Sequence, residues 1–224
     1  MREIVLDTET TGFNPSEGHR IVEIGCVELY NHVPTGTVWH SYVNPERDMP
    51  DGAFQVHGLS EAFLADHPVF AEITGEFLEF LGDAQLVIHN AAFDMGFINR
   101  ELEALDLAPI PMDRTVDTVQ IARTRFPGAQ ASLDALCRRF SIDNSARTKH
   151  GALLDAELLA EVYLELMGGR QRDFALVARE DSVQRGSAAE ERPVRAVRPH
   201  AASDAERAAH AEFIEGLTDP IWRL

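Results

Sequence analysis

The pattern of apolar and polar positions changes along the chain from a β-like to a helical period. Before residue 59 the apolar runs are short and strand-like, and beyond it apolar side chains recur at helical spacing. The predicted strands are Glu3–Thr10, Arg20–Leu29, Thr37–Asn44, Gln85–Asn90 and Thr115–Thr118. The predicted helices are Ser60–Ala65, Phe70–Gly82, Asp94–Leu105, Val119–Phe126, Ser132–Phe140 and Ala152–Met167. Three successive strands, followed by helices mixed with two more strands, are typical of an α/β layer fold.

A change of composition after about residue 181 predicts three segments. We expect residues 1–181 to form the folded domain. Residues 182–202 have no apolar periodicity and contain proline, arginine and glutamate, which predicts a flexible linker. Residues 203–224 return to helical spacing, and their apolar side chains need a surface on which to pack. These side chains are Phe213, Leu217, Ile221 and Trp222.

Composition and charge narrow the class of protein. The chain has 224 residues, of which 45% are hydrophobic, and no apolar run approaches the roughly 20 residues that a membrane span requires. The two cysteines, Cys26 and Cys137, match no C-x-x-C pattern, so we expect a soluble, cytoplasmic protein. With 20 Lys and Arg residues against 37 Asp and Glu residues, the net charge of −17 argues against a sequence-independent coat on nucleic acid. An enzyme that holds a few phosphates through metal ions is compatible with this charge.

Four acidic side chains are expected to point inward. Asp7 and Glu9 share one face of the first strand, because strand side chains alternate. Asp94, at the predicted start of a helix, and Asp155 lie on the apolar stripes of their helices, with no cation expected in their own sequence neighbourhoods. Carboxylates of this kind suit Mg²⁺ or Mn²⁺, and two-metal centres carry out phosphoryl displacement. The alternatives are a solvated acidic edge strand for Asp7 and Glu9 and a helix-dipole contact for Asp94.

His150 is the candidate proton acceptor of this acidic site. It precedes Asp155 by five residues, so the two serve one site only if His150 lies on a loop and the helix starts at Gly151. An unperturbed histidine has a pKa of about 6.5 and accepts a proton from water near neutral pH. The alternative is a surface histidine without a catalytic role.

Three motifs resemble, in order and spacing, those of the DEDDh 3′–5′ exonucleases. They are DTETTG at 7–12, HNAAFD at 89–94 and HGALLDA at 150–156. The resemblance covers about residues 1–168 and implies a ribonuclease-H-like exonuclease fold, an α/β fold with a five-stranded mixed sheet flanked by helices. By position, it implies that Asp7, Glu9, Asp94 and Asp155 bind two Mg²⁺ or Mn²⁺ ions and that His150 is the general base.

The same resemblance implies a substrate, the 3′ end of single-stranded DNA, from which 5′-mononucleotides are released. The segment FQVHGL at 54–59 is similar to the family's segment near the terminal nucleotide, so Val56 and His57 are expected to contact the base and the sugar. Thr10 and Phe93 are expected nearby, and Asp7, Glu9 and Asp155 are expected to contact the substrate as well. Some relatives carry a glutamate where this chain has Gly52, and His89 is expected to support the fold.

The end of the chain resembles that of the proofreading subunits of bacterial replicative DNA polymerases. This resemblance rests on Gly168 and Gly169, the linker and LTDPIWRL at 217–224. It implies that residues 203–224 bind the polymerase catalytic subunit, a helix with an apolar stripe being a common docking element. QRDFAL at 171–176 loosely resembles peptides that bind the sliding clamp, through Gln171, Phe174 and Leu176.

Three other functions remain open at this point. An RNA-trimming DEDDh exoribonuclease would use the same metals but would be expected to lack the linker and the tail with its tryptophan. A non-catalytic replisome scaffold would keep the fold for binding alone. A hydrolase of small phosphodiesters would need only the acidic site.

Overall fold

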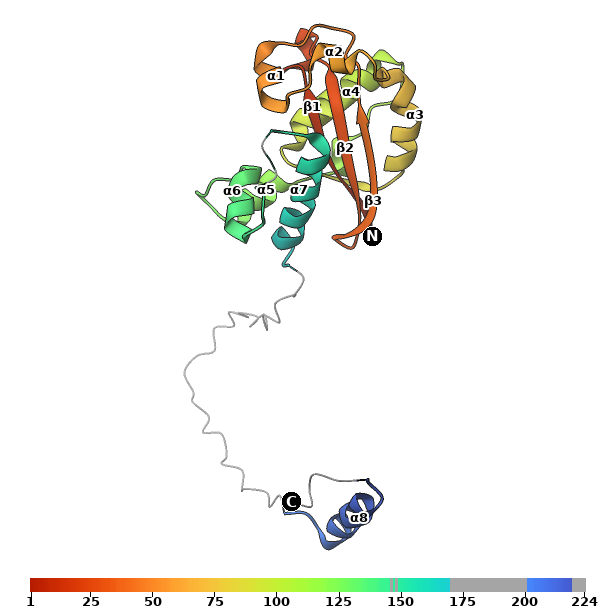
Figure 1. Ribbon diagram of the computed structural model, residues 1–224, viewed down its shortest axis with the longest axis vertical. Helices are drawn as coiled ribbons and strands as arrows, with labels where there is room; N and C mark the ends of the chain where they lie inside the picture. Colours follow the sequence, from red (N-terminus) through yellow and green to blue (C-terminus); the bar gives the residue numbers. More distant parts are fainter. Residues whose placement is uncertain (146, 148, 170–200, 219–224) are drawn as a thin grey trace, which may run out of the picture. The chain divides into compact units, whose positions relative to one another are not determined.

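The computed structural model describes residues 1–145, 147, 149–169 and 201–218 (Figure 1). These residues fall into two units, within Met1–Ala175 and Leu176–Leu224, and each is described by itself. Of the predicted linker at 182–202, only residues 201 and 202 belong to the described part. No helix within the described ranges is long and apolar enough to span a membrane.

A five-stranded mixed sheet in the order β3-β2-β1-β4-β5 forms the centre of the first unit. Its strands are β1 (Arg2–Thr10), β2 (Ile21–Tyr30), β3 (Val33–Tyr42), β4 (Gln85–Ile88) and β5 (Thr115–Asp117). β1, β2 and β3 pair antiparallel, whereas β4 runs parallel to β1 and to β5. The mixed sheet expected from the resemblance is therefore confirmed.

The helices agree with the predicted ones except for one addition and shifted ends. They are α1 (Asp51–His57), α2 (Glu61–Leu64), α3 (Phe70–Leu81), α4 (Ala91–Ala104), α5 (Thr118–Arg125), α6 (Leu133–Phe140) and α7 (Ala152–Leu166), with 3₁₀ turns at Pro15–Glu17 and Met112–Arg114. The pattern did not predict α1, because Phe54 and Val56 are exposed and give it no apolar stripe. The predicted start of a helix at Asp94 is wrong: α4 begins at Ala91, which places Asp94 in its first turn.

The start of β3 also differs from the prediction. The strand begins at Val33, four residues before the predicted Thr37, and continues β2 through a tight hairpin. Asn31 and His32 connect the two strands with φ angles of 51° and 68°, as in the two-residue turns that suit a twisted hairpin. The β-like pattern did not extend to Pro34 and Gly36, which are uncommon in strands but are tolerated at this edge of the sheet.

Helices cover both faces of the sheet, so that β1 lies between two apolar cores (Figure 1). Ile4 and Leu6 pack with α3 and α4 on one face, and Val5 packs with α6 and α7 on the other. Because strand side chains alternate, Asp7 and Glu9 lie on the same face as Val5, the face that α7 covers. The acidic pair thus continues a buried row of β1 and is not a solvated edge.

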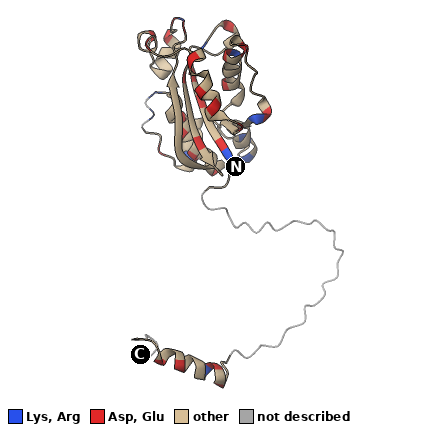
Figure 2. Ribbon diagram, turned by 90° about the vertical axis from the view of Figure 1, so that its right-hand side faces the viewer, with Lys and Arg blue, Asp and Glu red and all other residues tan. Residues whose placement is uncertain are grey.

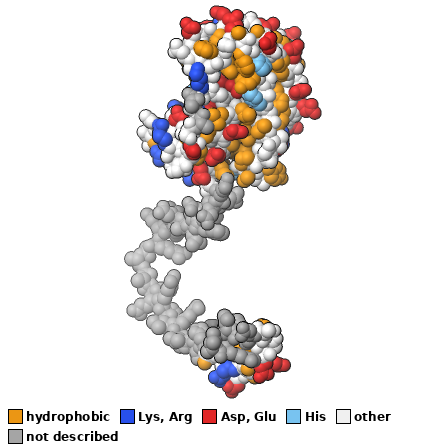
Figure 3. All heavy atoms as spheres, in the orientation of Figure 1, with side chains coloured by type: hydrophobic (Ala, Val, Ile, Leu, Met, Phe, Trp, Pro, Cys, Tyr) orange, Lys and Arg blue, Asp and Glu red, His pale blue; other side chains and the backbone are white. Residues whose placement is uncertain are grey.

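Exposed apolar side chains are unevenly distributed over the first unit. β3 is an edge strand whose residues are mostly exposed, and apolar side chains gather where β2 and β3 reach the surface (Figure 3). The exposed apolar residues on these two strands include Tyr30, Val33 and Val38. Acidic positions are distributed along the whole ribbon of this unit (Figure 2), in line with the acidic composition of the chain.

The second unit contains α8 (Asp204–Glu215), which lies within the predicted tail. Ser203 and Glu206 form a capping box: the Ser203 Oγ accepts from the Glu206 N–H, and the Glu206 carboxylate accepts from the Ser203 N–H at 2.8 Å. Phe213 and Leu217 are exposed. A helix is therefore confirmed for the first part of the predicted tail, but it ends before Leu217, and Ile221 and Trp222 lie outside the described residues.

The first testable prediction concerns Gly25, where α7 approaches the sheet. Gly25 is paired with Asp7, and a Cβ at Gly25 would overlap the backbone of Ala152 and Leu153 at the start of α7. We expect Gly25→Ala to lower the free energy of unfolding by about 1–3 kcal/mol, because the helix must move away from the strand. Denaturant titration measures the change.

The matched control is Gly75→Ala on the exposed face of α3, where a Cβ meets no atom within 4 Å. This change should raise the free energy of unfolding by about 0.5–1 kcal/mol, because alanine is the better helix former. Equal behaviour of the two variants would contradict the close approach of α7 to β2.

Candidate active site

The structure brings the five predicted catalytic residues to one cavity. Asp7 and Glu9 come from β1, and Asp94 comes from the first turn of α4. His150 lies on the loop before α7, and Asp155 lies in the first turn of that helix. All five line a cavity of about 370 Å³, together with Thr8, Phe13, Val56, His89, Phe93, Ser132, Leu133, Asp134 and Arg147. Residues far apart in the sequence therefore meet at one end of the central strand.

Backbone and side-chain hydrogen bonds hold Asp94 against β1. Its Oδ1 accepts from the Thr8 N–H at 3.0 Å and from the Thr8 Oγ at 2.7 Å. Asn90, in the left-handed conformation with a φ of 74°, turns the chain from β4 into α4 just before Asp94. Asp94 is therefore fixed between α4 and β1 while it lines the cavity.

Burial disfavours the ionised form of three of these carboxylates. It raises the pKa of Asp7 well above its usual range, and the charges of Asp94, Glu9 and Asp155 raise it further. Burial raises the pKa of Glu9 to about 8, with additional contributions from Asp155 and Glu23. Burial also raises the pKa of Asp94 to about 7, although the hydrogen bonds from Thr8 lower it. These three carboxylates can therefore all be ionised at neutral pH only when a positive charge in the cavity stabilises them.

The residues present fit a divalent cation. One ligand atom from each of Glu9, His150 and Asp155 lies within 4.8 Å of the others. Asp7 and Asp94 line the same cavity and add hard oxygen donors. The donor set is rich in carboxylates and contains no cysteine among the described lining residues, which favours Mg²⁺ or Mn²⁺ over zinc.

His150 lies where the prediction placed it. It stands on the loop, Gly151 is the N-cap, and α7 begins at Ala152. The His150 N–H donates to the Val56 carbonyl oxygen, and the ring Nδ1 lies 3.4 Å from Asp155 Oδ2. With 48% of its side chain exposed, His150 is accessible to water while it faces the carboxylates.

The structure adds one residue that the sequence reasoning missed. Arg147 forms an ion pair with Asp155, so the expectation of no cation near Asp155 in the sequence is wrong. The residue precedes Asp155 by eight positions, and its Nε donates to the Asp155 carboxylate. The only sign of this pair in the sequence is a basic residue in the loop before His150. Helical spacing relates positions within one helix, so it could not predict a contact between this loop and α7.

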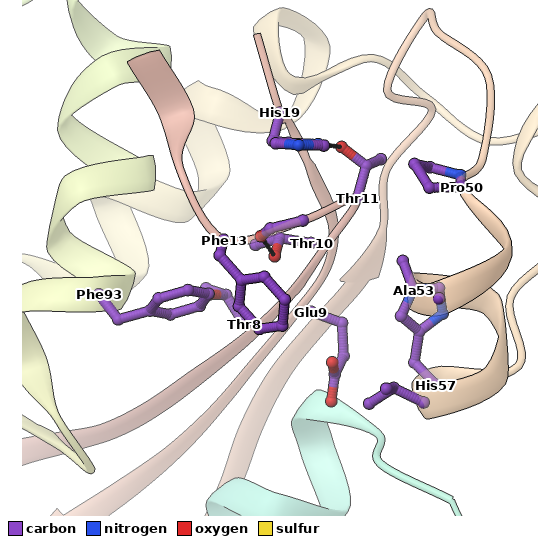
Figure 4. Close-up of a pocket in the computed structure, with 13 residues that line it drawn as sticks. Thr8, Glu9, Thr10, Thr11, Phe13, His19, Pro50, Ala53, His57 and Phe93 are labelled. Atoms are coloured by element: carbon purple, nitrogen blue, oxygen red, sulfur yellow. Dashed lines mark hydrogen bonds between the residues drawn. The ribbon is translucent and has the colours of Figure 1, made fainter. Parts of the chain in front are cut away.

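A second cavity of about 380 Å³ adjoins the carboxylates (Figure 4). It is lined by Val56 and His57, which were predicted to contact the terminal nucleotide, and by Thr10 and Phe93, which were expected nearby. Gly52, where some relatives carry a glutamate, also lines it, and Glu9 stands between the Phe93 side and α1. Phe13 borders both cavities with 89% of its surface exposed, and the sequence reasoning did not single it out.

His57 presents an unused hydrogen-bond donor in this second cavity. Its Nδ1 accepts from the Leu59 N–H at 3.0 Å, which places the proton of the neutral ring on Nε2. Burial lowers the pKa of His57, so the neutral form is favoured. The Nε2 atom is buried and makes no hydrogen bond of good geometry within the described part of the chain, although the nearby Thr10 backbone partly offsets the lowering of the His57 pKa. A buried donor without a partner is costly, and a bound polar ligand relieves that cost.

His89 is held by groups of the fold. Its Nδ1 lies 2.9 Å from the Thr118 Oγ, which itself donates to the Ile88 carbonyl oxygen. Asp117 is the N-cap of α5 and accepts from the Val119 N–H. This arrangement agrees with the expectation that His89 supports the fold, and it shows that the contacts lie at the ends of β4 and β5.

Comparison with known proteins identifies the family. Residues 4–163 match the exonuclease family. The chain is 56% identical over 180 residues to the DNA polymerase III subunit epsilon of Rickettsia conorii, covering 79% of this chain and 78% of that protein. It is 48% identical over 220 residues to the DNA polymerase III subunit epsilon of Escherichia coli, covering 93% of this chain and 90% of that protein. The chain belongs to the exonuclease family.

The fold of this exonuclease is that of the DEDDh enzymes. It is similar to the nuclease domain of 3′hExo, a DEDDh family member solved with rAMP, with a TM-score of 0.65 at 17% identity. The match covers 74% of this chain and 91% of that chain. The predicted ribonuclease-H-like fold and the resemblance to DEDDh exonucleases are confirmed, and the family implies dependence on a divalent metal.

The raised pKa values predict how the stability of this exonuclease depends on pH without metal. Glu9 has an ordinary pKa of about 4.5 and a folded value of about 8, so folding takes up a proton between these limits. The stabilisation is present below about pH 4.5 and is lost as the pH rises toward about 8. In EDTA, calorimetry should therefore show a melting temperature that falls across this interval.

Two comparisons test the origin of that slope. Glu9→Gln, which cannot ionise, should flatten it, whereas Glu79→Gln on the exposed surface of α3 should leave it unchanged. Saturating Mg²⁺ should also flatten it, because a bound cation keeps the carboxylates ionised at lower pH. A melting temperature that rises with pH in EDTA would refute the electrostatic description of the site.

Proposed function

We propose that this exonuclease is the proofreading subunit of a replicative DNA polymerase. It removes mispaired 3′-terminal nucleotides from DNA as 5′-mononucleotides. The observation that carries the proposal is the junction of the two cavities, which share Thr8, Glu9, Phe13, Val56 and Phe93. A terminal nucleoside in the apolar cavity would place its phosphodiester at the carboxylates. The relatives named DNA polymerase III subunit epsilon, which match over most of the chain, support this function.

Asp7, Glu9, Asp94 and Asp155 are the residues that would hold two Mg²⁺ or Mn²⁺ ions. When bound, such ions would promote water attack and stabilise the charge on the leaving 3′ oxygen. Thr8 orients Asp94 for this task through two hydrogen bonds. Burial keeps bulk water away from the carboxylates, which strengthens their interaction with any cation.

His150 is the proposed general base. Its Nδ1 faces Asp155, and its half-exposed ring stands where an attacking water can enter. The ring would accept the proton of that water at Nδ1 and release it to solvent after cleavage. The backbone hydrogen bond from His150 to Val56 links the base to the second cavity, so that its position depends on the segment that contacts the nucleoside.

Selection of mispaired ends requires no reading of the bases. A mispaired 3′ end separates from its template more readily than a paired one, and the cost of unpairing falls accordingly. The carboxylates of Glu9, Asp94 and Asp155 are buried, so a duplex end would have to unpair before its terminal phosphodiester reaches them. The apolar walls formed by Val56 and Phe93 would then hold the separated base.

The tail would deliver the enzyme to its substrate. We propose that α8 and the residues after it dock on the polymerase catalytic subunit, a role supported by the exposed Phe213 and Leu217. Ile221 and Trp222, together with the proposed clamp-binding residues Gln171, Phe174 and Leu176, lie outside the described residues. The linker would raise the local concentration of the exonuclease at the growing DNA end. These partners place the protein in the cytoplasm.

The decisive experiment measures cleavage of 3′ ends. With Mg²⁺, the wild type should trim mispaired DNA primers faster than paired ones and act poorly on RNA. His150→Ala should lower kcat about 10²–10⁴-fold, as expected for the loss of a general base, and Asp7→Asn should abolish activity. Labelled oligonucleotides and gel analysis provide the rates.

His67→Gln is the matched histidine control, because His67 packs on Tyr42 and Phe63 and lines neither cavity. Its rates should equal those of the wild type. Preference for RNA would favour the exoribonuclease function, and full activity of Asp7→Asn would contradict the proposed site.

A separate prediction concerns the donor of His57. Removing it in His57→Ala should raise the KM for single-stranded DNA about tenfold, the loss expected for one hydrogen bond to a polar partner, with a smaller effect on kcat. His57→Gln, which keeps an N–H near the position of Nε2, should recover part of this loss. Steady-state kinetics separate the two constants, and an unchanged KM in His57→Ala would remove His57 from the substrate site.

A further inference from the structure

A single arginine engages the proposed metal ligand on α7. The Arg147 Nε lies 2.5 Å from Asp155 Oδ1, and the Arg147 NH2 group lies 2.6 Å from Asp155 Oδ2. The side chains of Arg147 and Asp155 are only 8% and 3% exposed. Both oxygens of Asp155 therefore bind one guanidinium in a buried bidentate pair, the strongest geometry for an arginine and a carboxylate.

The same guanidinium also forms a hydrogen bond with His150, the proposed general base. Its NH2 group donates to His150 Nδ1 at 2.8 Å. Because arginine only donates, Nδ1 must accept, and the neutral His150 ring then carries its proton on Nε2. The ring lone pair that would accept a proton from water is thus already used. In this arrangement neither Asp155 nor His150 is available for the proposed reaction.

A third contact anchors Arg147 independently of the proposed ligands. Its NH1 group donates to Asp134 Oδ1 at 2.8 Å, and Asn144 donates to the same oxygen at 3.0 Å. Asp134 lies in the first turn of α6, where the N-cap is Ser132, so its carboxylate is free to bind these two side chains. The guanidinium can therefore leave Asp155 and His150 while it stays bound to Asp134.

Charge explains why an arginine stands at this place. Five carboxylates line the cavity, those of the four proposed metal ligands and that of Asp134, and Arg147 is the one permanently charged cation among its described lining residues. Carboxylates that line one small cavity repel each other strongly when they are buried. The guanidinium supplies positive charge at the two oxygens that a divalent ion would use, and the two cations exclude each other there.

We propose that Arg147 is an internal counter-ion, which replaces the divalent cation at Asp155 in the metal-free protein and must leave Asp155 and His150 before cleavage. This proposal rests on the proposed metal site. Metal binding then has to break the pair between Arg147 and Asp155, so the affinity for metal is lower than the carboxylates alone would provide. Arg147 acts here as a positioning residue that couples metal binding to the release of the base.

Calorimetric titration of the full chain with Mn²⁺ tests the competition directly. Arg147→Met should bind Mn²⁺ about tenfold more tightly than the wild type, the factor expected when a hydrogen-bonded charge pair no longer has to be broken. Its melting temperature in EDTA should be lower, and its increase on adding Mn²⁺ larger, than in the wild type.

Arg125→Met is the matched control. Arg125 also holds α7, but it donates to the backbone carbonyl oxygens of Glu165 and Leu166 at the opposite end of the helix, at 3.1 and 2.6 Å. This variant should lose the same stability with and without Mn²⁺ and should keep the wild-type Kd. A Kd for Arg147→Met that equals or exceeds the wild-type value would overturn the proposal.

A second measurement observes Arg147 in the wild type itself. The nitrogen-15 NMR signal of the Arg147 Nε–H, assigned by its loss in Arg147→Lys, should exchange slowly with water in EDTA. Saturating Mg²⁺ should shift this signal and speed its exchange, whereas an unchanged signal would refute release from Asp155.

The calorimetric titration separates the two proposals. If the wild type binds no Mn²⁺, the proposed metal site fails and Arg147 has no competitor. If wild type and Arg147→Met bind equally, only the role of Arg147 fails.

Discussion

Repulsion among the clustered carboxylates of the candidate active site is the interaction that links the folding, the cation binding and the pH response of this protein. Asp7 and Glu9 extend the most central strand of the sheet, Asp94 is tied to that strand through Thr8, and α7 brings Asp155 against it where Gly25 leaves room. The packing that builds the apolar cores therefore also forces negative charges together. Each charge raises the cost of the next, because little water is present to screen them. Folding, cation binding and the response to pH are consequently coupled at this one place.

Recognition and chemistry are divided between parts of the fold that are packed into the apolar cores to different degrees. The carboxylates stand on β1, α4 and α7, which are packed on the two apolar cores. The second cavity is closed by α1, a short helix whose only buried residue is His57. Such a division suits an enzyme that must hold its reactive groups still while it accepts any of four bases, since apolar walls and one hydrogen-bond donor discriminate little between bases.

The acidic character of the chain gains a physical meaning in the proposed function. A protein with a net charge of −17 is repelled by free DNA, so an unattached exonuclease would rarely reach a 3′ end. Docking of α8 on a partner would replace this missing attraction by a high local concentration. Arg147 would add a second level of control inside the site, because its guanidinium engages Asp155 and His150 until a divalent cation competes for the same oxygens.

The sequence alone was sufficient for the local features and for the identity of the reactive groups. Strand alternation placed Asp7 and Glu9 on one face, helical spacing turned Asp155 inward, and three motifs in order indicated the family. The sequence did not predict α1, the start of α4 or the hairpin before β3, because exposed residues and positive φ angles leave little periodic signal. Only the tertiary structure decided how the two cavities join and that Arg147 pairs with Asp155. Such contacts depend on loops and on the packing of distant elements, which no periodic pattern within a single segment can specify.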